Sequence, residues 1–165
     1  MTYRTRTASL KDYQKGAAEL FGDDPKRYAF SNVYEVGNLF GPFERIAVTK
    51  SMEYVTEVMK VEGTGPWFAA AHDEFALVMD GEVEILFVEA GVDVVPAADH
   101  LGAVLLDSDP VGPRMGTVRA RHGHLVLLPG GAAYRISADP SALVLLQTMA
   151  GDLTQEHWAE ICQTR

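Results

Sequence analysis

Short runs of strand-forming residues, separated by glycine and proline, fill most of this chain from Tyr28 onward. Closely spaced runs of this kind are typical of an antiparallel barrel or sandwich. We therefore predict an all-β core with a short helix at each end. The predicted strands are Phe43–Lys50, Tyr54–Val61, Trp67–Ala71, Glu74–Met79, Glu82–Val88, Thr117–Arg121, Leu125–Leu128, Ala133–Ser137 and Leu143–Met149, with a further short candidate at Val104–Leu106.

The dipeptide Asp80-Gly81 stands between two of these runs and predicts a tight β-hairpin. Glycine accepts the positive φ that two-residue hairpin turns need, and Asp-Gly is a favoured pair there. We therefore expect Phe75–Met79 and Val83–Phe87 to pair directly with each other. The stretch Ala90–Pro113, rich in proline, glycine and alanine, is predicted to be a long excursion from the barrel.

Helical patterns flank the predicted strands. Apolar residues from Ser9 to Phe21 fall on one helical face, with Ser9 as the N-cap candidate. Asp152 can likewise cap a helix from Leu153 to Gln163. The predicted organisation is a helical extension at 1–27, a barrel at 28–151 and a C-terminal helix at 152–165.

Composition excludes several classes of function. The 165 residues, 47% of them hydrophobic, suffice for the core of a single domain. A net charge of −9, from 14 basic and 23 acidic residues, argues against nucleic-acid and anionic-membrane partners. Cys162 has no second cysteine to pair with, which favours the cytoplasm. Neither a secretion signal nor a membrane span is expected from the sequence.

Two segments carry a recognisable framework. The run AAAHDEFALVMDGEVEI has Glu74, six residues and then Gly81. The run GHLVLLPGGAAYRI has Gly123, Pro129, Gly131 and Tyr134 at fixed spacings. Both resemble the two motifs of the cupin superfamily. The resemblance implies a double-stranded β-helix, also called a jelly-roll barrel.

The metal ligands of those motifs are mostly replaced. The two histidines of the first motif would fall on Phe68 and Ala70, or on Trp67 and Ala69 with the longer spacing. The histidine of the second motif falls on Tyr134 and its asparagine on Ala138. Only Glu74 remains of the four ligands. A lone carboxylate is a poor site for a divalent transition metal, so we predict no metal at this position.

Three residues near the motifs are candidates for chemistry. Glu74 and Tyr134 could act as an acid–base pair if both project into an apolar barrel, where desolvation would raise both pKa values. His72 stands two residues before Glu74. It is either a hydrogen-bonded structural residue or part of a non-standard metal site with Glu74 and one of His122 and His124.

A closer resemblance extends over most of the chain from Tyr28. The runs that carry it are FSNVYEV, EGTGPWFAAAHDEFALVMDGEV, RMGTV, RHGHLVLLPGGAAYR and LLQTMAGDLTQEHWAEIC. They resemble the small subunit of the two-subunit hydroquinone dioxygenases. The family implies cupin folds in both subunits, a heterotetramer of two small and two large chains, and Fe(II) bound by the larger, catalytic subunit. It opens hydroquinone to 4-hydroxymuconic semialdehyde in bacterial degradation of aromatic compounds such as 4-nitrophenol and 4-hydroxyacetophenone.

Two other functions remain open at this point. One is a stand-alone cupin enzyme, such as an isomerase, cyclase or lyase, that uses Glu74 and Tyr134 and turns over without a partner. The other is a homodimeric barrel that binds an aromatic or other small molecule in an internal pocket. The predicted lining of that pocket is Trp67, Phe68, Phe75 and Met79. The resemblance instead implies a chain with no cofactor of its own and iron in its partner.

Overall fold

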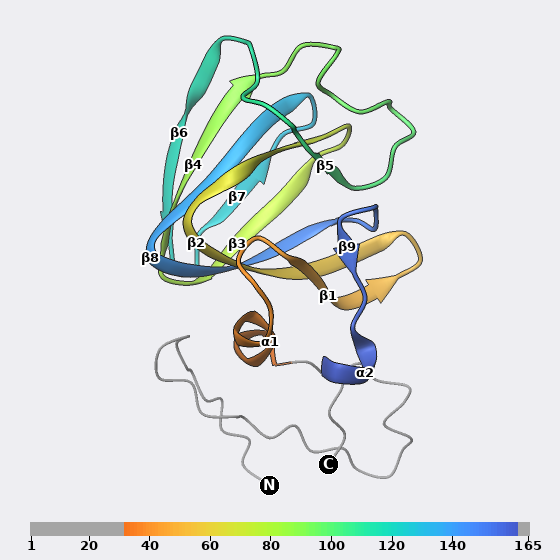
Figure 1. Ribbon diagram of the computed structural model, residues 1–165, viewed down its shortest axis with the longest axis vertical. Coiled ribbons are helices and arrows are strands. Elements are labelled where there is room, and N and C mark those ends of the chain that lie inside the picture. Colours follow the sequence, from red (N-terminus) through yellow and green to blue (C-terminus); the bar gives the residue numbers. More distant parts are fainter. Residues whose placement is uncertain (1–31, 162–165) are drawn as a thin grey trace, which may run out of the picture.

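The structure is a computed structural model that describes residues 32–161, so the helix predicted at Ser9–Phe21 lies outside the described residues. Within them the chain forms nine strands and two short helices (Figure 1). The strands are β1 (Arg45–Ser51), β2 (Tyr54–Ala70), β3 (Glu74–Asp80), β4 (Glu82–Glu89), β5 (Ala103–Leu105), β6 (Arg114–Arg121), β7 (Leu125–Leu128), β8 (Ala132–Met149) and β9 (Thr154–Gln155). The helices are α1 (Val33–Leu39) and α2 (Trp158–Ile161).

The strands form one curled sheet, which confirms the predicted all-β core. The main order is β6-β4-β8-β2-β1-β9, while β3 pairs with β7 and β8, and β5 pairs with β2. Side chains from β2, β3, β4, β6, β7 and β8 meet in one buried cluster on the inner face of the sheet. We call this cluster the inner core. The polar site described below lies beside it.

Two pairs of predicted strands are continuous in the structure. Strand β2 unites the runs predicted at Tyr54–Val61 and Trp67–Ala71, and β8 unites those at Ala133–Ser137 and Leu143–Met149. The two long strands pair antiparallel with each other along most of their length, with register shifts where each bends. Because each strand finds a partner on both sides of its bend, the turn residues within it bend the strand without ending it.

The predicted hairpin at Asp80-Gly81 is wrong. Strands β3 and β4 do not pair with each other, since both pair with β8: Phe75 lies opposite Gln147, and Glu84 lies opposite Ser137. Gly81 has a φ of 77°, and a Cβ there would come within 2.6 Å of the carbonyl oxygen of Ser141. At Gly81 the chain therefore stops pairing with one half of β8 and begins to pair with the other half. The glycine does not reverse the chain.

Helix α1, which the sequence analysis did not predict, packs against the outer face of the sheet. Asn32 caps the helix by accepting hydrogen bonds from the backbone N–H groups of Tyr34 and Glu35. Gly37 lies so close to Leu143 that a Cβ would come within 2.3 Å of Leu143 Cδ1. A second buried cluster joins the helices to the outer face of the sheet: Val36, Ile46, Val48, Val58, Leu143 and Ile161.

The C-terminal helix begins later than predicted. Residues Thr154–Gln155 form β9, which pairs in parallel with the start of β1, and α2 begins only at Trp158. The parallel pairing uses the backbone of a segment that the Asp152 cap pattern assigned to a helix. Figure 1 shows α1 and α2 at the same end of the barrel. No helix among residues 32–161 is long and apolar enough to cross a membrane.

Candidate functional site

A buried ionic network lies inside the barrel. Its centre is Arg45 on β1, which is 2% exposed. Arg45 Nε donates to Glu57 Oε2 at 2.5 Å, and Nη2 donates to Glu74 Oε1 at 2.7 Å. The two carboxylates, on β2 and β3, are 1% and 0% exposed. One guanidinium therefore bridges two buried carboxylates that stand on different strands.

Neutral hydroxyl groups complete the network. The Tyr134 hydroxyl donates to Glu74 Oε2 at 2.6 Å and accepts from Arg45 Nη1 at 3.3 Å. Thr154 Oγ1 donates to Glu57 Oε1 at 2.6 Å. Each carboxylate oxygen of Glu57 and Glu74 thus accepts at least one hydrogen bond, which is the condition for burying such groups without a large penalty.

The pKa shifts correct the expectation that both members of the Glu74–Tyr134 pair are raised. Burial alone would raise the pKa of Glu74, but the Arg45 charge and hydrogen bonds from Tyr134, Thr148 and Arg45 hold it below its usual value. Burial and the Glu74 carboxylate raise the pKa of Tyr134 well above its usual value. Burial would lower the pKa of Arg45, yet Glu74, Tyr134 and Glu57 raise it well above its usual value.

The charge state of the network therefore does not change near neutral pH. Arg45 is protonated, Glu74 is ionised and Tyr134 is neutral. A general acid or base needs a pKa near the working pH, and Glu74 and Tyr134 are shifted away from it in opposite directions. The arrangement suits a structural ion cluster better than proton transfer.

The residues at the cupin metal position do not fit a metal ion. Glu74 and Tyr134, at two of the four ligand positions, both bind the Arg45 guanidinium. Phe68, at a histidine position of the first motif, stacks its ring on that of Tyr134, with centroids 5.6 Å apart. In residues 32–161, no three His, Cys, Asp or Glu side chains are grouped so that they could hold a metal. A protein cation thus bridges Glu74 and Tyr134.

His72 reaches this network only indirectly. Its Nε2 lies 3.1 Å from Thr148 Oγ1, and Thr148 in turn hydrogen-bonds to Glu74. His122 and His124 are exposed, and the Nδ1 atom of His124 contacts the backbone of its own turn. The structure therefore does not assemble the non-standard site of His72, Glu74 and one of these two histidines.

The four residues predicted to line one pocket lie on different faces of the sheet. Phe68 points into the inner core, while its neighbour Trp67 packs on the outer face, beneath the 90–113 excursion. Trp67 Nε1 donates to Asp109 at 2.8 Å, and the Arg135 guanidinium lies 4.6 Å from the Trp67 ring centroid. Adjacent residues of a strand face opposite ways, so Trp67 and Phe68 cannot share the interior.

The same alternation separates the other two predicted pocket residues from the interior. On β3, Glu74, Ala76 and Val78 are buried and face inward. Phe75 is 40% exposed on the outer face, and Met79 packs against the cluster that holds α1. Of the four predicted lining residues, only Phe68 belongs to the inner core.

Sequence reasoning missed Arg45, Glu57 and Thr154. A signal for Glu57 existed, because it shares the period-two face of Met59 and Val61, which are both in the inner core. Arg45 directly precedes an apolar run in β1, but nothing in the sequence says that it turns inward. Thr154 fell within a predicted helix, so its place beside Glu57 could not be anticipated.

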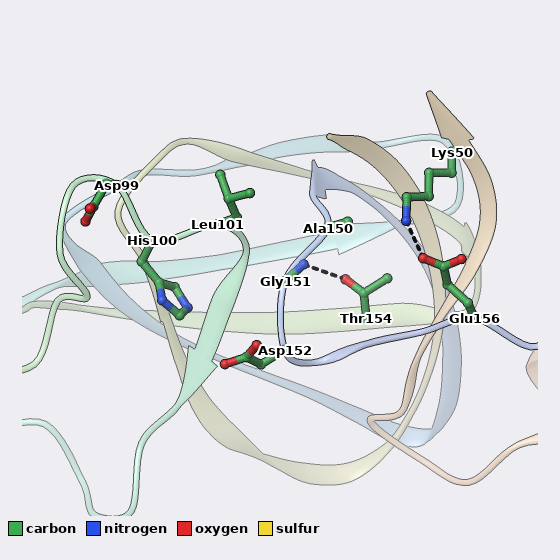
Figure 2. Close-up of a pocket in the computed structure, with 9 residues that line it drawn as sticks. All are labelled: Lys50, Asp99, His100, Leu101, Ala150, Gly151, Asp152, Thr154 and Glu156. Atoms are coloured by element: carbon green, nitrogen blue, oxygen red, sulfur yellow. Dashed lines mark hydrogen bonds and ion pairs between the residues drawn. The ribbon is translucent and has the colours of Figure 1, made fainter. Parts of the chain in front are cut away.

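Two cavities border the network. One, of about 220 Å³, lies at the mouth of the barrel and reaches Arg45 and Phe68. The other, of about 490 Å³, is an open cleft between the 99–101 turn and the segment from Ala150 to Glu156 (Figure 2). In this cleft Lys50 is ion-paired with Glu156, and Gly151 N donates to Thr154 Oγ1 (Figure 2). Thr154 therefore connects the wall of the cleft to the buried network.

Comparison with known proteins links the chain to hydroquinone 1,2-dioxygenases. A crystal structure of hydroquinone 1,2-dioxygenase from Sphingomonas sp. TTNP3, with 4-hydroxybenzoate bound, is 44% identical and matches with a TM-score of 0.91 over 99% of both chains. A chain of hydroquinone 1,2-dioxygenase PnpCD, in complex with Cd²⁺ and 4-hydroxybenzonitrile, is 42% identical, with a TM-score of 0.89 over 99% of this chain and 98% of that chain. No protein-family model and no curated protein matches.

Two more distant structures share the fold. A cupin-2 domain containing protein from Shewanella frigidimarina is 18% identical, with a TM-score of 0.52 over 72% of this chain and 93% of that chain. A chain of PnpCD in complex with Fe³⁺ is 9% identical, with a TM-score of 0.63 over 86% of this chain but only 39% of that chain. The chain therefore has the fold of a cupin domain, and it belongs to the hydroquinone 1,2-dioxygenase family.

Proposed function

We propose that this chain is the small, metal-free subunit of a hydroquinone ring-cleaving dioxygenase whose iron is bound by a larger cupin partner. The observation that carries the proposal is the Arg45 guanidinium, which bonds to both Glu74 and Tyr134 at the cupin ligand positions. The near-complete coverage of two hydroquinone dioxygenase chains at 44% and 42% identity supports the assignment to this enzyme.

The ligand chemistry of the barrel supports placing the iron in another chain. Iron in cupin-like sites is held by imidazoles and carboxylates. Here Phe68 replaces an imidazole, the Tyr134 phenol stays neutral, and both Glu74 oxygens already accept hydrogen bonds from Tyr134 and Arg45. A metal entering this position would have to displace a buried guanidinium that already bonds to both Glu74 and Tyr134. The barrel is thus built for folding and contacts.

The comparisons also support a larger partner. Structures of the same enzyme, PnpCD, contain one chain of nearly this length and one of which this chain covers only 39%. The longer chain shares this fold at a TM-score of 0.63. We propose that two copies of each type form the complex in the cytoplasm. In the proposed reaction both atoms of dioxygen enter the ring-opened product, 4-hydroxymuconic semialdehyde.

The test is co-expression of this chain with the larger cupin chain of a hydroquinone dioxygenase, followed by purification through a tag on this chain. The complex should contain iron and consume dioxygen with hydroquinone, whereas the small chain alone should show neither property. The variant Tyr134→Phe removes the remaining oxygen donor next to Glu74. The complex should therefore keep its iron content and turnover when the small chain carries this substitution.

Two outcomes would contradict the proposal. Turnover of hydroquinone by the isolated small chain would favour a stand-alone enzyme. Loss of iron from the complex on Tyr134→Phe, with the complex otherwise intact by gel filtration, would place the metal in this barrel. A matched control is Tyr54→Phe, because Tyr54 is 64% exposed on the outer part of β2.

A further inference from the structure

A row of apolar residues crosses five strands on the outer face of the sheet. Its members are cross-strand neighbours in the order Ile46 (β1), Val58 (β2), Leu145 (β8), Leu77 (β3) and Leu125 (β7). At the β1 end, Ile46 and Val58 belong to the cluster that joins the helices to the sheet, and they are 2% and 1% exposed. At the β7 end, Leu125 is 64% exposed. The two helices therefore cover only part of a continuous apolar surface.

The uncovered part of this surface carries no charged side chain. A second row of cross-strand neighbours lies two residues further along the same strands: Thr56, Gln147, Phe75 and Leu127. We call the uncovered residues of both rows the open face: Thr56, Leu77, Phe75, Leu125, Leu127, Leu145 and Gln147. Charged residues make up 22% of the chain but none of the open face. Exclusion of charge is typical of the core of a protein interface.

Strand β7, at the margin of the open face, is an unprotected edge. Among residues 32–161 it pairs with β3 alone. Natural edge strands usually carry charges or proline, which prevent them from pairing with other chains. Strand β6 also has a single partner, β4, and it follows this rule with three exposed arginines, Arg114, Arg119 and Arg121. Strand β7 consists of Leu125–Leu128, with neither charge nor proline. An edge of this kind calls for a partner that covers it.

The larger cupin chain of the proposed enzyme is the partner that fits this face, so the inference rests on the proposed function. The longer PnpCD chain shares the fold of this chain at a TM-score of 0.63. It therefore contains a sheet of comparable twist, and two such sheets can pack face to face. A second copy of this chain fits less well, because two chains of net charge −9 repel each other.

We propose that the open face is the surface on which this chain docks onto its larger cupin partner. Phe75, Leu125 and Leu127, which are 40%, 64% and 47% exposed in the chain alone, become buried in the complex. Burial of these side chains supplies the hydrophobic gain of association. The partner also covers the edge of β7, which prevents other chains from pairing there.

The experiment measures the affinity of the larger cupin chain of a hydroquinone dioxygenase for this full chain, immobilised through a tag. Leu127→Lys brings a charge into the interface and should weaken binding by about thirtyfold or more. The matched control is Met115→Lys on β6, because Met115 is 55% exposed and lies outside the open face. This control should leave the affinity unchanged. Circular dichroism should show that both variants melt close to the wild type, since both positions are exposed.

Hydrogen exchange gives a second measurement that needs no substitution. Binding of the larger chain should slow the exchange of backbone amides in Leu125–Leu128 but not in Arg114–Arg121. Unchanged exchange in β7, or unchanged affinity of a folded Leu127→Lys variant, would overturn this inference and leave the proposed function standing. Absence of any binding by the unsubstituted chain would overturn the proposed function and this inference with it. A dimer of the isolated chain that Leu127→Lys separates, with its affinity for the larger chain unchanged, would assign the face to a second copy instead.

Discussion

Replacing Arg45 by methionine tests whether the buried cation holds the barrel together. Methionine keeps much of the length and apolar stem of the side chain but removes the guanidinium. Glu57 and Glu74 would then remain almost fully buried without their cation. The substitution therefore separates the charge of Arg45 from its packing.

The expected loss of stability is large. Removal of one partner from a buried ion pair costs about 3–5 kcal/mol, because it leaves an uncompensated buried charge. Folded domains are stable by only about 5–15 kcal/mol in total. At this chain length, each kcal/mol lowers the melting temperature by about 2–4 °C. The Arg45→Met variant should therefore melt roughly 6–20 °C below the wild type.

Urea unfolding at neutral pH, followed by circular dichroism, measures this loss. The control is Lys50→Met, which removes the exposed ion pair with Glu156 and should cost about 0–1 kcal/mol. If Arg45→Met were no more destabilising than Lys50→Met, the guanidinium would not be the cation that stabilises the barrel. In that case the reasoning from burial and charge would be refuted.

The pH dependence of the same variant gives an independent check. In the wild type the folded-state pKa of Glu74 is lowered, so its stabilisation is present above the unfolded value of about 4.3 and is lost as the pH falls through the lower folded value. Without Arg45, burial should dominate and raise the pKa of Glu74. The stability deficit of the variant should then shrink as the pH falls from neutral. A deficit independent of pH would mean that lost packing causes it.

A third comparison assigns the cause to the carboxylates. Adding Glu57→Gln and Glu74→Gln to Arg45→Met removes the unpaired charges and leaves neutral groups that can hydrogen-bond. The triple variant should be more stable than Arg45→Met alone, because neutral replacement of a buried ionic cluster is often tolerated. A further loss of stability would contradict this account.

Three further predictions concern single residues. Tyr134→Phe removes the hydroxyl that donates to a buried carboxylate and should cost about 1–3 kcal/mol in urea unfolding. Because the pKa of Tyr134 is raised in the folded protein, the wild type should lose more stability above about pH 10 than this variant does. Gly81→Ala forces alanine into a φ of 77° with a Cβ 2.6 Å from Ser141 O. Thermal melting should show that the free energy of unfolding falls by about 1–2 kcal/mol or more. The control Gly91→Ala, with no atom within 4 Å of the added Cβ, should melt like the wild type. Asn32→Ala removes the cap of α1 and should destabilise the helix by about 0.5–2 kcal/mol. Hydrogen exchange of the backbone amides in α1 should therefore be faster in the variant. Unchanged exchange would show that packing alone maintains α1.

Most of the strand pattern was predictable because it depends on local chemistry. The β7 limits, Leu125–Leu128, match the prediction, and most other predicted strands differ from the observed ones at their ends. The errors lie where a distant segment decides the outcome. Asp80-Gly81 has the residues of a hairpin turn, but β8 continues past it and pairs with the strands on both sides. Likewise, Thr154–Gln155 form a strand because they pair with β1, although the sequence pattern predicted a helix there.

The site was predictable only in part. The motif spacing led to Glu74 and Tyr134, and the structure places them in direct contact at 2.6 Å. The same motif spacing predicted that the histidine ligands are replaced by other residues. The direction of the Glu74 pKa was mistaken, because the sequence alone does not bring Arg45 from β1 to β3. That contact spans residues far apart in the chain, and its charge outweighs the desolvation that the sequence argument assumed.

The sequence by itself determined the fold class, the family resemblance and the absence of the usual cupin histidines. Each of these follows from residue types and short spacings, which are local properties of the chain. Only the tertiary structure decided what stands in the place of those ligands. The curled sheet brings Arg45, Glu57 and Glu74 together from three strands, and burial of the carboxylates makes a cation necessary there. A guanidinium supplies the positive charge within the chain itself, because the fold delivers it to both carboxylates.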